Sequence, residues 1–394
     1  MFTYKTFNNI AEEGLSVMAS RNIHDASENP DGLMLRSHKL AVAEFGNNLS
    51  AIARAGAGVN NIPIVDATDL GVVVFNTPGA NANAVKELVI CGMLLSSRGI
   101  VDGINFAKGL DSNDADALNK MLEAQKKTFV GNELAGKTIG IVGLGAIGSM
   151  LAQACQALGM KLVGYDPHIS IDSAWRLPRE VEKAETLEEL LKKSDYVSLH
   201  VPLVEATKNL INSSNLRHFK SDARLINLSR GGIVNSNDVI KALENKNLSR
   251  FVTDFPTPEL IARSVKQSDV IILPHLGAST KEAEINCSVM AANQLANFLQ
   301  DGTIVNSVNF PNVSQERSTL NRLVVINKNE PGMISKITDS IASLDLNIAD
   351  MTNKSRNDIA INLIDLEHEA SDKLISQLRS IDHVLKVRSI NKAS

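Results

Sequence analysis

Residues 137–148 read Lys-Thr-Ile-Gly-Ile-Val-Gly-Leu-Gly-Ala-Ile-Gly, an apolar run that ends in a Gly-x-Gly-x-x-Gly pattern. The run Thr138–Gly143 is rich in β-branched residues and predicts a buried strand. Gly159 stands where a following helix would end, and apolar residues recur before it at helical spacing, at Ile147, Leu151, Cys155 and Leu158. A strand, a tight glycine turn and an amphipathic helix in this order predict the first half of a βαβ unit.

Further apolar, β-rich runs follow at intervals that leave room for a helix between them. They are Lys161–Asp166, Asp195–His200, Arg224–Leu228, Phe251–Asp254 and Val270–Leu273. Strands separated by helical segments indicate a parallel sheet with helices on both faces. Residues 98–277 are therefore expected to form one doubly wound α/β domain of the Rossmann type.

The glycine pattern has a chemical interpretation because of its context. Gly143 allows the tight turn, Gly145 lets the backbone approach a pyrophosphate, and Gly148 lets the helix pack on the strand. Asp166 ends the next strand, about 20 residues on, where it would accept hydrogen bonds from the adenosine ribose and repel a 2′-phosphate. We therefore expect NAD rather than NADP; a glycine-rich turn without a ligand is the alternative.

The segments on both sides of this block predict two further domains. Strand-like or helical patterns occur at Gly32–Leu35, Val72–Phe75, Ala82–Ser97 and Lys281–Leu299, so we expect a second α/β domain built from residues 1–97 and 278–310. Residues 311–319 are polar and predict a linker. Residues 320–394 then show the order strand, helix, strand, strand, helix, strand, with Pro331 in the first turn of the first helix, which is the order of a ferredoxin-like domain.

The composition excludes several classes of function. The 394 residues carry a net charge of -4 and are 44% hydrophobic and 21% charged, as in a soluble protein without a basic surface for nucleic acid. No apolar run is long enough to cross a membrane, so we expect a cytoplasmic protein that binds neither membrane nor nucleic acid. Cys91, Cys155 and Cys287 show neither metal nor disulfide spacing and are expected to be buried, inert thiols.

Three charged or titratable residues are expected where strands of the central domain end. Ligands of parallel α/β sheets bind at the carboxyl ends of the strands. His275 follows the last strand and could take a hydroxyl proton, whereas Arg230 follows an earlier strand and could grip a carboxylate through two hydrogen bonds. Glu259, which follows the strand-ending Asp254, could orient the imidazole of His275. With NAD, the three residues fit the oxidation of an alcohol that carries a carboxylate.

Each residue of this trio also has a purely structural interpretation. A single histidine at a strand end is often a structural hydrogen-bonding residue, a lone arginine is often a surface cation, and a loop glutamate usually faces water. Their joint position beside the glycine loop favours the catalytic interpretation.

Several separate motifs resemble those of the D-isomer-specific 2-hydroxyacid dehydrogenases, and within that family those of its D-3-phosphoglycerate dehydrogenase branch. The motifs are Arg54-Ala-Gly-Ala-Gly-Val-Asn-Asn-Ile, Asn76-Thr-Pro-Gly, Gly140-Ile-Val-Gly-Leu-Gly-Ala-Ile-Gly, Tyr165-Asp-Pro, Leu199-His-Val-Pro-Leu, Asn227-Leu-Ser-Arg-Gly-Gly and Pro274-His-Leu-Gly-Ala-Ser-Thr. The resemblance covers nearly the whole chain. It implies that Arg230, Glu259 and His275 are the catalytic residues. It also implies that the second α/β domain is a flavodoxin-like substrate-binding domain and that the C-terminal domain is an ACT domain.

The resemblance further implies cofactor and substrate contacts. The implied NAD-binding residues are Gly143, Gly145, Ala146, Ile147, Gly148, Asp166, His200, Val201, Pro202, Thr207, Ser229, Asp254, Gly277 and Ala278. The implied substrate-binding residues are Arg36, Arg54, Gly56, Gly58 and Asn81. The two arginines would hold a phosphate, although a surface role for Arg36 is equally open. Ala146 departs from the family, because many members carry arginine at that position.

The implied reaction is the NAD-dependent oxidation of D-3-phosphoglycerate to 3-phosphohydroxypyruvate, the first committed step of serine biosynthesis, by a homodimer or homotetramer. The ACT domain would bind the effector L-serine at Asn327, Asn329 and Asn347. Two other interpretations remain open. One is a different 2-hydroxyacid dehydrogenase, such as a glyoxylate or hydroxypyruvate reductase. The other is an NAD-sensing corepressor, a class that shares the fold and the trio.

Overall fold

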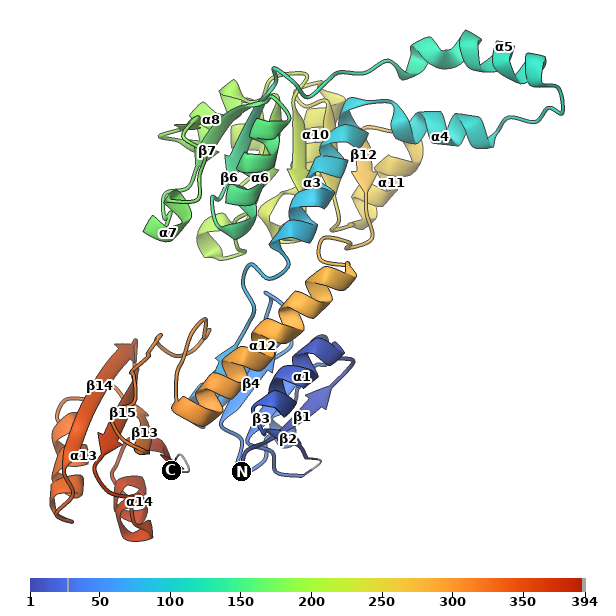
Figure 1. Cartoon of the computed structure of the whole chain (residues 1–394). Coiled ribbons are helices and arrows are strands. Elements are labelled where there is room, and N and C mark those ends of the chain that lie inside the picture. Colours follow the sequence, from blue (N-terminus) through green and yellow to red (C-terminus); the bar gives the residue numbers. More distant parts are fainter. Residues whose placement is uncertain (27, 392–394) are drawn as a thin grey trace. The chain divides into compact units, whose positions relative to one another are not determined.

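The computed structural model describes residues 1–26 and 28–391, which fall into two compact units (Figure 1). The first unit contains the chain up to Asn81 and from Lys281 onward, and the second unit contains Ala82–Thr280. The chain therefore crosses between the units twice, after Asn81 and after Thr280.

The second unit is built on a seven-stranded sheet whose strand pairs are all parallel. Its strands are β6 (Thr138–Val142), β7 (Lys161–Tyr165), β8 (Val181–Lys183), β9 (Tyr196–Leu199), β10 (Arg224–Asn227), β11 (Arg250–Thr253) and β12 (Val270–Ile272). The order β12-β11-β10-β9-β6-β7-β8 reverses between β6 and β9. This confirms the predicted doubly wound fold, in which ligands bind where the strand order reverses.

Helices cover both faces of this sheet (Figure 1). They are α3 (Ala82–Ser97), α6 (Ala146–Ala157), α8 (Leu187–Lys193), α10 (Ser236–Glu244) and α11 (Pro258–Lys266), with the short helices α7 (Ile171–Ala174) and α9 (Ser213–Leu216). The sequence assigned α3 to the first domain. In the structure, Val89 and Met93 of α3 pack in the core of the second unit with Ile226 and Val252. Apolar periodicity shows that a helix is buried, but it does not show which sheet buries it.

Two further helices of the second unit, α4 (Ile100–Lys108) and α5 (Ala115–Gln125), extend away from its sheet (Figure 1). Neither helix has a buried residue. Large apolar side chains that are 38% to 48% exposed lie along them, at Ile100, Ile104, Met121 and Leu122. The pair is therefore an arm with uncovered apolar surface.

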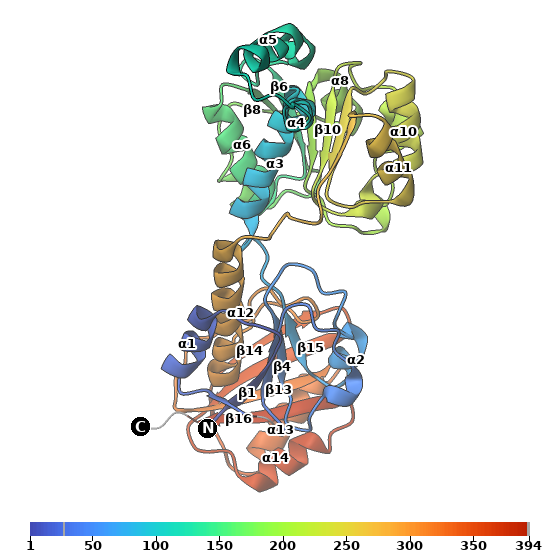
Figure 2. The same ribbon diagram turned by 90° about the vertical axis from the view of Figure 1, so that its right-hand side faces the viewer.

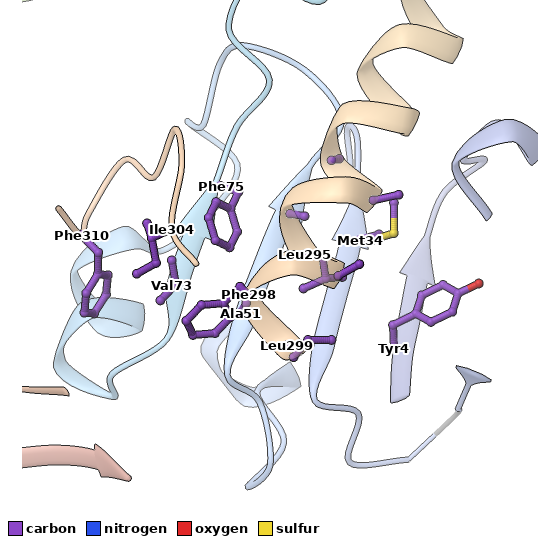
Figure 3. Close-up of a cluster of buried hydrophobic side chains, with 14 of the residues drawn as sticks. Tyr4, Met34, Ala51, Val73, Phe75, Leu295, Phe298, Leu299, Ile304 and Phe310 are labelled. Atoms are coloured by element: carbon purple, nitrogen blue, oxygen red, sulfur yellow. The ribbon is translucent and has the colours of Figure 1, made fainter. Parts of the chain in front are cut away.

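The first unit contains a five-stranded parallel sheet of order β2-β1-β3-β4-β5. Its strands are β1 (Thr3–Phe7), β2 (His24–Asp25), β3 (Gly32–Leu35), β4 (Ala51–Arg54) and β5 (Val73–Phe75), and its helices are α1 (Glu12–Ser20), α2 (Ile64–Asp69) and α12 (Lys281–Asp301). This order is that of the expected flavodoxin-like domain. Figure 3 shows the core between α12 and the sheet, where Leu295 and Phe298 lie among Met34, Ala51 and Phe75.

The C-terminal part of the first unit has the predicted βαββαβ order. Its elements are β13 (Asn321–Lys328), α13 (Met333–Ala342), β14 (Ile348–Arg356), β15 (Ile359–Leu366), α14 (Asp372–Arg379) and β16 (Val384–Asn391). The strands form an antiparallel sheet of order β14-β15-β13-β16, as in a ferredoxin-like fold. We call residues 320–391 the C-terminal domain. Helix α13 begins at Met333 instead of Pro331, because Gly332 takes a left-handed φ of +83°.

The C-terminal sheet has two covered faces. Helices α13 and α14 cover one face, where Leu323, Val325, Ile337 and Leu374 form a small core. The other face shares a core with the N-terminal sheet and α12 (Figure 2). The predicted linker is fixed in place, because Val313 pairs with Ile304 in a β-bridge. The polar composition of residues 311–319 therefore marks a boundary between two domains, but the segment at this boundary is held in place and is not flexible.

Among the described residues, no helix is both long and apolar enough to cross a membrane. The same residues hold no cluster of three or more histidine, cysteine or acidic side chains that could bind a metal ion. Cys155 and Cys287 are buried as expected, and burial raises the pKa of Cys155 to about 12. Cys91 is exposed, against expectation, because it lies on the outward face of α3.

Candidate active site

The glycine loop after β6 has the geometry that its sequence predicted. Gly143 has a φ of +92°, which favours glycine. A Cβ added at Gly148 would lie 2.1 Å from the carbonyl oxygen of Gly143, so only glycine lets α6 approach the strand this closely. At Gly145 an added Cβ would meet nothing within 4 Å, and α6 begins directly after it. An open glycine at a helix N-terminus, where backbone N–H groups are unpaired, suits a phosphate group.

Asp166 lies beside this loop at the end of β7. Its Oδ2 accepts a hydrogen bond from the backbone N–H of Leu144 at 2.8 Å, and its Oδ1 accepts one from the N–H of His168 at 2.9 Å. These contacts fix the carboxylate next to the glycine turn. Each oxygen keeps a further lone pair that a ribose hydroxyl could use.

The loop after β9 lies on the other side of the point where the strand order reverses. A Cβ at Gly143 would lie 2.8 Å from the backbone of His200, so the two loops are in close contact. Burial lowers the pKa of His200 to about 4, which leaves its imidazole neutral at pH 7, with Nε2 2.8 Å from the hydroxyl of Ser198. The Ser229 hydroxyl donates to the carbonyl of Val201 at 2.7 Å. The implied cofactor residues of β6, β7, β9 and β10 therefore meet at one edge of the sheet.

The segment Val201–Thr207 closes on itself. The Thr207 hydroxyl donates to the carbonyl of Pro202 at 2.5 Å and accepts from the N–H of Val204 at 2.9 Å. Thr207 therefore stabilises the conformation of this loop. The sequence had suggested only a cofactor contact for this residue.

Asp254 is the most buried acidic residue of this edge, with 1% of its surface exposed. Its Oδ2 accepts from the N–H of Gly277 at 3.1 Å, while its Oδ1 is buried without a hydrogen-bond partner. Burial raises the pKa of Asp254, and the hydrogen bond from Gly277 together with the charges of His275 and Arg230 offsets part of that rise. An unpartnered buried oxygen here is suited to a carboxamide donor from a bound nicotinamide.

His275 and Arg230 both lie close enough to Asp254 for their charges to lower its pKa. His275 is exposed, has a left-handed φ of +52°, and packs edge-on against Phe255 with 5.0 Å between ring centroids. Arg230 is exposed, and its Nη1 donates to the carbonyl of Ser229 at 2.7 Å. Asn227 was not anticipated as a site residue, but its Nδ2 donates to the carbonyl of Arg230 at 2.9 Å and holds that loop.

Glu259 is near this group in sequence but is not joined to His275. In the part of the chain that the structure describes, no hydrogen bond or ion pair links the two side chains. Glu259 lies in the first turn of α11, where hydrogen bonds from its own N–H and from Thr257 lower the pKa of its carboxyl group. The Thr257 side chain also caps α11 by accepting a hydrogen bond from the N–H of Leu260, so the helix begins at Pro258.

The implied substrate residues of the first unit gather at the carboxyl ends of two neighbouring strands. Arg36 follows β3 and Arg54 ends β4, and the Nε of Arg54 donates to the carbonyl of Arg36 at 3.1 Å. A Cβ at Gly56 would lie 2.3 Å from Nη1 of Arg54, so this glycine leaves room for the guanidinium group. Gly58 lies in the same loop, whereas Asn81 is the last residue before the chain crosses to the second unit.

Arg36 has a partner that the sequence did not indicate. Its guanidinium forms an ion pair with Glu284 in the first turn of α12. A glutamate in a helix is commonly solvated, and no local pattern relates it to a residue far away in the chain. Glu284 therefore adds a negative charge beside the two arginines.

The three implied effector asparagines do not lie together within one chain. Asn327 is 2% exposed, and its amide is used internally, with Oδ1 accepting from Asn362 at 2.8 Å and Nδ2 donating to the carbonyl of Lys328 at 2.6 Å. Asn329 follows it and donates to the carbonyl of Asn357 at 3.1 Å. Asn347 precedes β14 at the other end of the sheet, about 20 Å away along the strands.

Comparison with known proteins agrees with this geometry. Residues 103–277 match the sequence profile of the D-isomer specific 2-hydroxyacid dehydrogenase, NAD binding domain. A D-3-phosphoglycerate dehydrogenase of Haemophilus influenzae is 32% identical over 91% of this chain and 85% of its own length. One of Synechocystis is 35% identical over 76% of this chain and 52% of its own length. The NAD+-bound 3-phosphoglycerate dehydrogenase structure of Entamoeba histolytica superposes with a TM-score of 0.61 at 25% identity, over 78% of this chain and 98% of that one.

The chain thus spans about half the length of the Synechocystis relative but most of the Haemophilus one. The Haemophilus match covers 91% of this chain and therefore extends beyond residues 103–277 of the family profile. The chain belongs to the D-isomer-specific 2-hydroxyacid dehydrogenase family.

Proposed function

We propose that the protein oxidises D-3-phosphoglycerate to 3-phosphohydroxypyruvate with NAD as hydride acceptor. The observation that carries the substrate assignment is the pair Arg36 and Arg54 at adjacent strand ends, because a phosphate requires more than one cation or hydrogen-bond donor. The relatives named D-3-phosphoglycerate dehydrogenase support the same assignment.

The residues of the second unit fit NAD. The open Gly145 and the N-terminus of α6 would receive the pyrophosphate, Asp166 the adenosine ribose, and the free oxygen of Asp254 the nicotinamide carboxamide. When bound, NAD supplies a hydride acceptor. Asp254 and the neutral imidazole of His200 lie beside the proposed NAD site, and neither side chain adds a positive charge to that site.

The chain's own residues account for the remaining chemistry. Arg230 would hold the substrate carboxylate through its forked N–H donors, with Asn227 fixing the loop that presents it. His275 would accept the proton of the C2 hydroxyl as the hydride leaves C2. Glu259 is proposed to orient the imidazole during turnover, since its present contact with Thr257 is exposed and easily exchanged.

The direct test measures NADH formation from 3-phosphoglycerate and from glycerate. We expect kcat/KM for 3-phosphoglycerate to be at least about tenfold higher, which is about 1.4 kcal/mol of transition-state binding from the phosphate. Arg54→Ala should raise KM for 3-phosphoglycerate and leave glycerate almost unaffected. Preference for glycerate would favour a glyoxylate or hydroxypyruvate reductase, and the absence of turnover with NADH-dependent partner binding would favour a corepressor.

Cofactor choice rests on Asp166, and two matched variants separate its roles. The wild type should bind NADH at least about tenfold more tightly than NADPH in a fluorescence titration. Asp166→Asn removes the charge and keeps one acceptor oxygen, for the N–H of Leu144, while the N–H of His168 loses its acceptor. The variant should therefore narrow the preference for NADH while the glycine turn is still held. Asp166→Ala also removes that acceptor and should weaken both cofactors. Tighter NADPH binding by the wild type would refute the role of Asp166.

We also propose that the chain works in the cytoplasm as a homodimer or homotetramer that uses the arm α4–α5. The exposed apolar side chains of this arm support the assignment, since such surface on a soluble protein commonly marks an interface. Light scattering should give a mass of at least twice 42.5 kDa, and Ile104→Glu with Met121→Glu should lower it. A wild-type monomer would contradict this proposal.

Serine is proposed as the effector of the C-terminal domain. Because Asn347 lies far from Asn329 in one chain, a complete site would require Asn347 from a second copy. This arrangement suits the ammonium and carboxylate of an amino acid, and millimolar serine should reduce the rate of NADH formation.

A further inference from the structure

The amide of Asn61 links the two strand ends that carry Arg36 and Arg54. Its Oδ1 accepts a hydrogen bond from Nε of Arg54 at 3.2 Å. Its Nδ2 donates to the carbonyl of Arg36 at 3.2 Å and to the carbonyl of His38 at 2.7 Å. The backbone carbonyl of Asn61 also accepts from the N–H of Leu40 at 3.0 Å. This one residue therefore contacts the loop after β3 at three points and the Arg54 guanidinium at one.

Only one orientation of this amide satisfies all its partners. Nε of Arg54 can only donate a hydrogen bond, whereas the backbone carbonyls of Arg36 and His38 can only accept one. An amide turned by half a rotation would set its N–H groups against Nε and its oxygen against the two carbonyls. The contacts therefore require an oxygen and an NH2 group on one short side chain, which asparagine supplies and aspartate does not.

Apolar packing holds Asn61 in turn. Ile62, the next residue, is buried in the same cluster as Leu35 and Leu40, which flank the loop after β3. The N–H of Ile62 donates to the carbonyl of Val59 at 3.1 Å and closes the turn before it. The amide of Asn61 therefore has a fixed base from which to position its partners.

Holding Nε determines where the rest of the Arg54 guanidinium lies. The group is planar, and its Nε donates both to Asn61 and to the carbonyl of Arg36, at 3.2 and 3.1 Å. Its Nη1 lies where a Cβ on Gly56 would collide with it. A planar fork grips a phosphate through two parallel hydrogen bonds, so the strength of that contact depends on how the fork is oriented.

Arg36 is anchored through its backbone. Its carbonyl accepts from Arg54 and from Asn61, while its guanidinium forms the ion pair with Glu284. A phosphate would compete with this carboxylate for the guanidinium group. The backbone contacts would keep Arg36 beside Arg54 while that exchange takes place.

We propose that Asn61 is a positioning residue that sets Arg36 and Arg54 for a phosphate group, and thereby determines the preference for a phosphorylated over an unphosphorylated 2-hydroxy acid. Asn61 lies seven residues after Arg54, and the loop between them returns the chain to the end of β4. The role in specificity rests on the proposed function, whereas the positioning of the arginines does not.

Hydrogen–deuterium exchange of the full-length protein tests the positioning without substrate. Asn61→Asp keeps an acceptor for Nε of Arg54 but sets its second oxygen against two carbonyls, and Asn61→Ala removes all three side-chain contacts. Both variants should speed exchange of the N–H groups of His38 and Leu40 about tenfold, because the loop opens more often. Asn60→Asp is the matched control, since it adds the same charge at the neighbouring, exposed position. Exchange at the wild-type rate in both Asn61 variants would overturn the positioning role.

Initial rates of NADH formation from 3-phosphoglycerate and from glycerate then test the specificity. Both Asn61 variants should raise KM for 3-phosphoglycerate at least about tenfold, while KM for glycerate and kcat for either substrate change less than about twofold. The kcat for glycerate also shows that the variants are folded, and Asn60→Asp should behave like the wild type with both substrates. Equal losses with the two substrates, or an unchanged KM for both, would overturn the role in specificity. If the wild type does not prefer 3-phosphoglycerate, the proposed substrate and the role in specificity both fail, while the exchange result still decides the positioning.

Discussion

Replacing His275 by asparagine is expected to lower kcat for 3-phosphoglycerate oxidation on the order of a hundredfold or more while the protein remains folded. The loss follows from removing the group proposed to accept the hydroxyl proton. Asparagine is the informative choice because His275 has a φ of +52°, and asparagine tolerates this left-handed conformation better than alanine. The side chain is exposed, so its removal leaves no buried group without a partner.

A second histidine provides the control for this variant. His383 in the C-terminal domain also has a left-handed φ, of +74°, and has no proposed part in the reaction. His383→Asn should therefore leave kcat and KM unchanged. Near-normal turnover by His275→Asn, measured as initial rates of NADH formation with saturating substrate, would remove His275 from the mechanism.

Glu259→Gln distinguishes an orienting carboxylate from a solvated one. If Glu259 orients His275, kcat should fall about tenfold with little change in the KM for NAD, because the effect acts on proton transfer. If the contact with Thr257 is its whole role, kcat should not change. The present structure shows the second arrangement, so this variant decides whether the first one forms during turnover.

Local patterns were sufficient to predict most of the second unit. The glycine loop, Asp166 and the strand ends could be placed because their spacing follows from the geometry of one βαβ unit repeated along a sheet. The order of strands and helices in the C-terminal domain was also predicted correctly. Strand β8 was missed because Val181-Glu-Lys183 is too short and polar to show a period.

Relations between distant segments could not be predicted from local patterns. The assignment of α3 to a sheet, the pairing of Arg36 with Glu284, and the internal use of the Asn327 amide each depend on how elements pack. The arginines that donate to the last carbonyls of α12 are the clearest case. Arg317, Arg322 and Arg388 look like ordinary polar residues of a linker and of two strands, and only the position of α12 gives them carbonyl partners.

The buried pair Arg322–Asp365 should dominate the stability of the C-terminal domain. Both side chains are fully buried, and Asp365 also accepts hydrogen bonds from the N–H and hydroxyl of Ser318, at 2.9 and 3.1 Å. Asp365→Leu would leave the Arg322 charge buried without its partner. The expected loss is about 3–5 kcal/mol in the free energy of unfolding, measured by urea denaturation.

The double variant Arg322→Met with Asp365→Leu separates the charge from the packing. It replaces the pair by apolar groups of similar size, so it should recover most of the stability lost in Asp365→Leu, although the carbonyl of Asp301 loses a donor. A double variant as unstable as Asp365→Leu would show that capping α12, and not neutralising a buried charge, is the larger contribution.

The same pair predicts how stability depends on pH. Burial raises the pKa of Asp365, but the hydrogen bonds from Arg322 and Ser318 outweigh burial and hold the pKa below its ordinary value. A carboxyl group whose pKa is lower in the folded state contributes its full stabilisation above its unfolded pKa of about 3.9 and loses it as the pH falls through the folded value. Wild-type stability should therefore fall in acid, and the double variant should fall less steeply over the same range, because it lacks this carboxylate. Parallel curves for the two proteins would show that Asp365 does not bind a proton in this range.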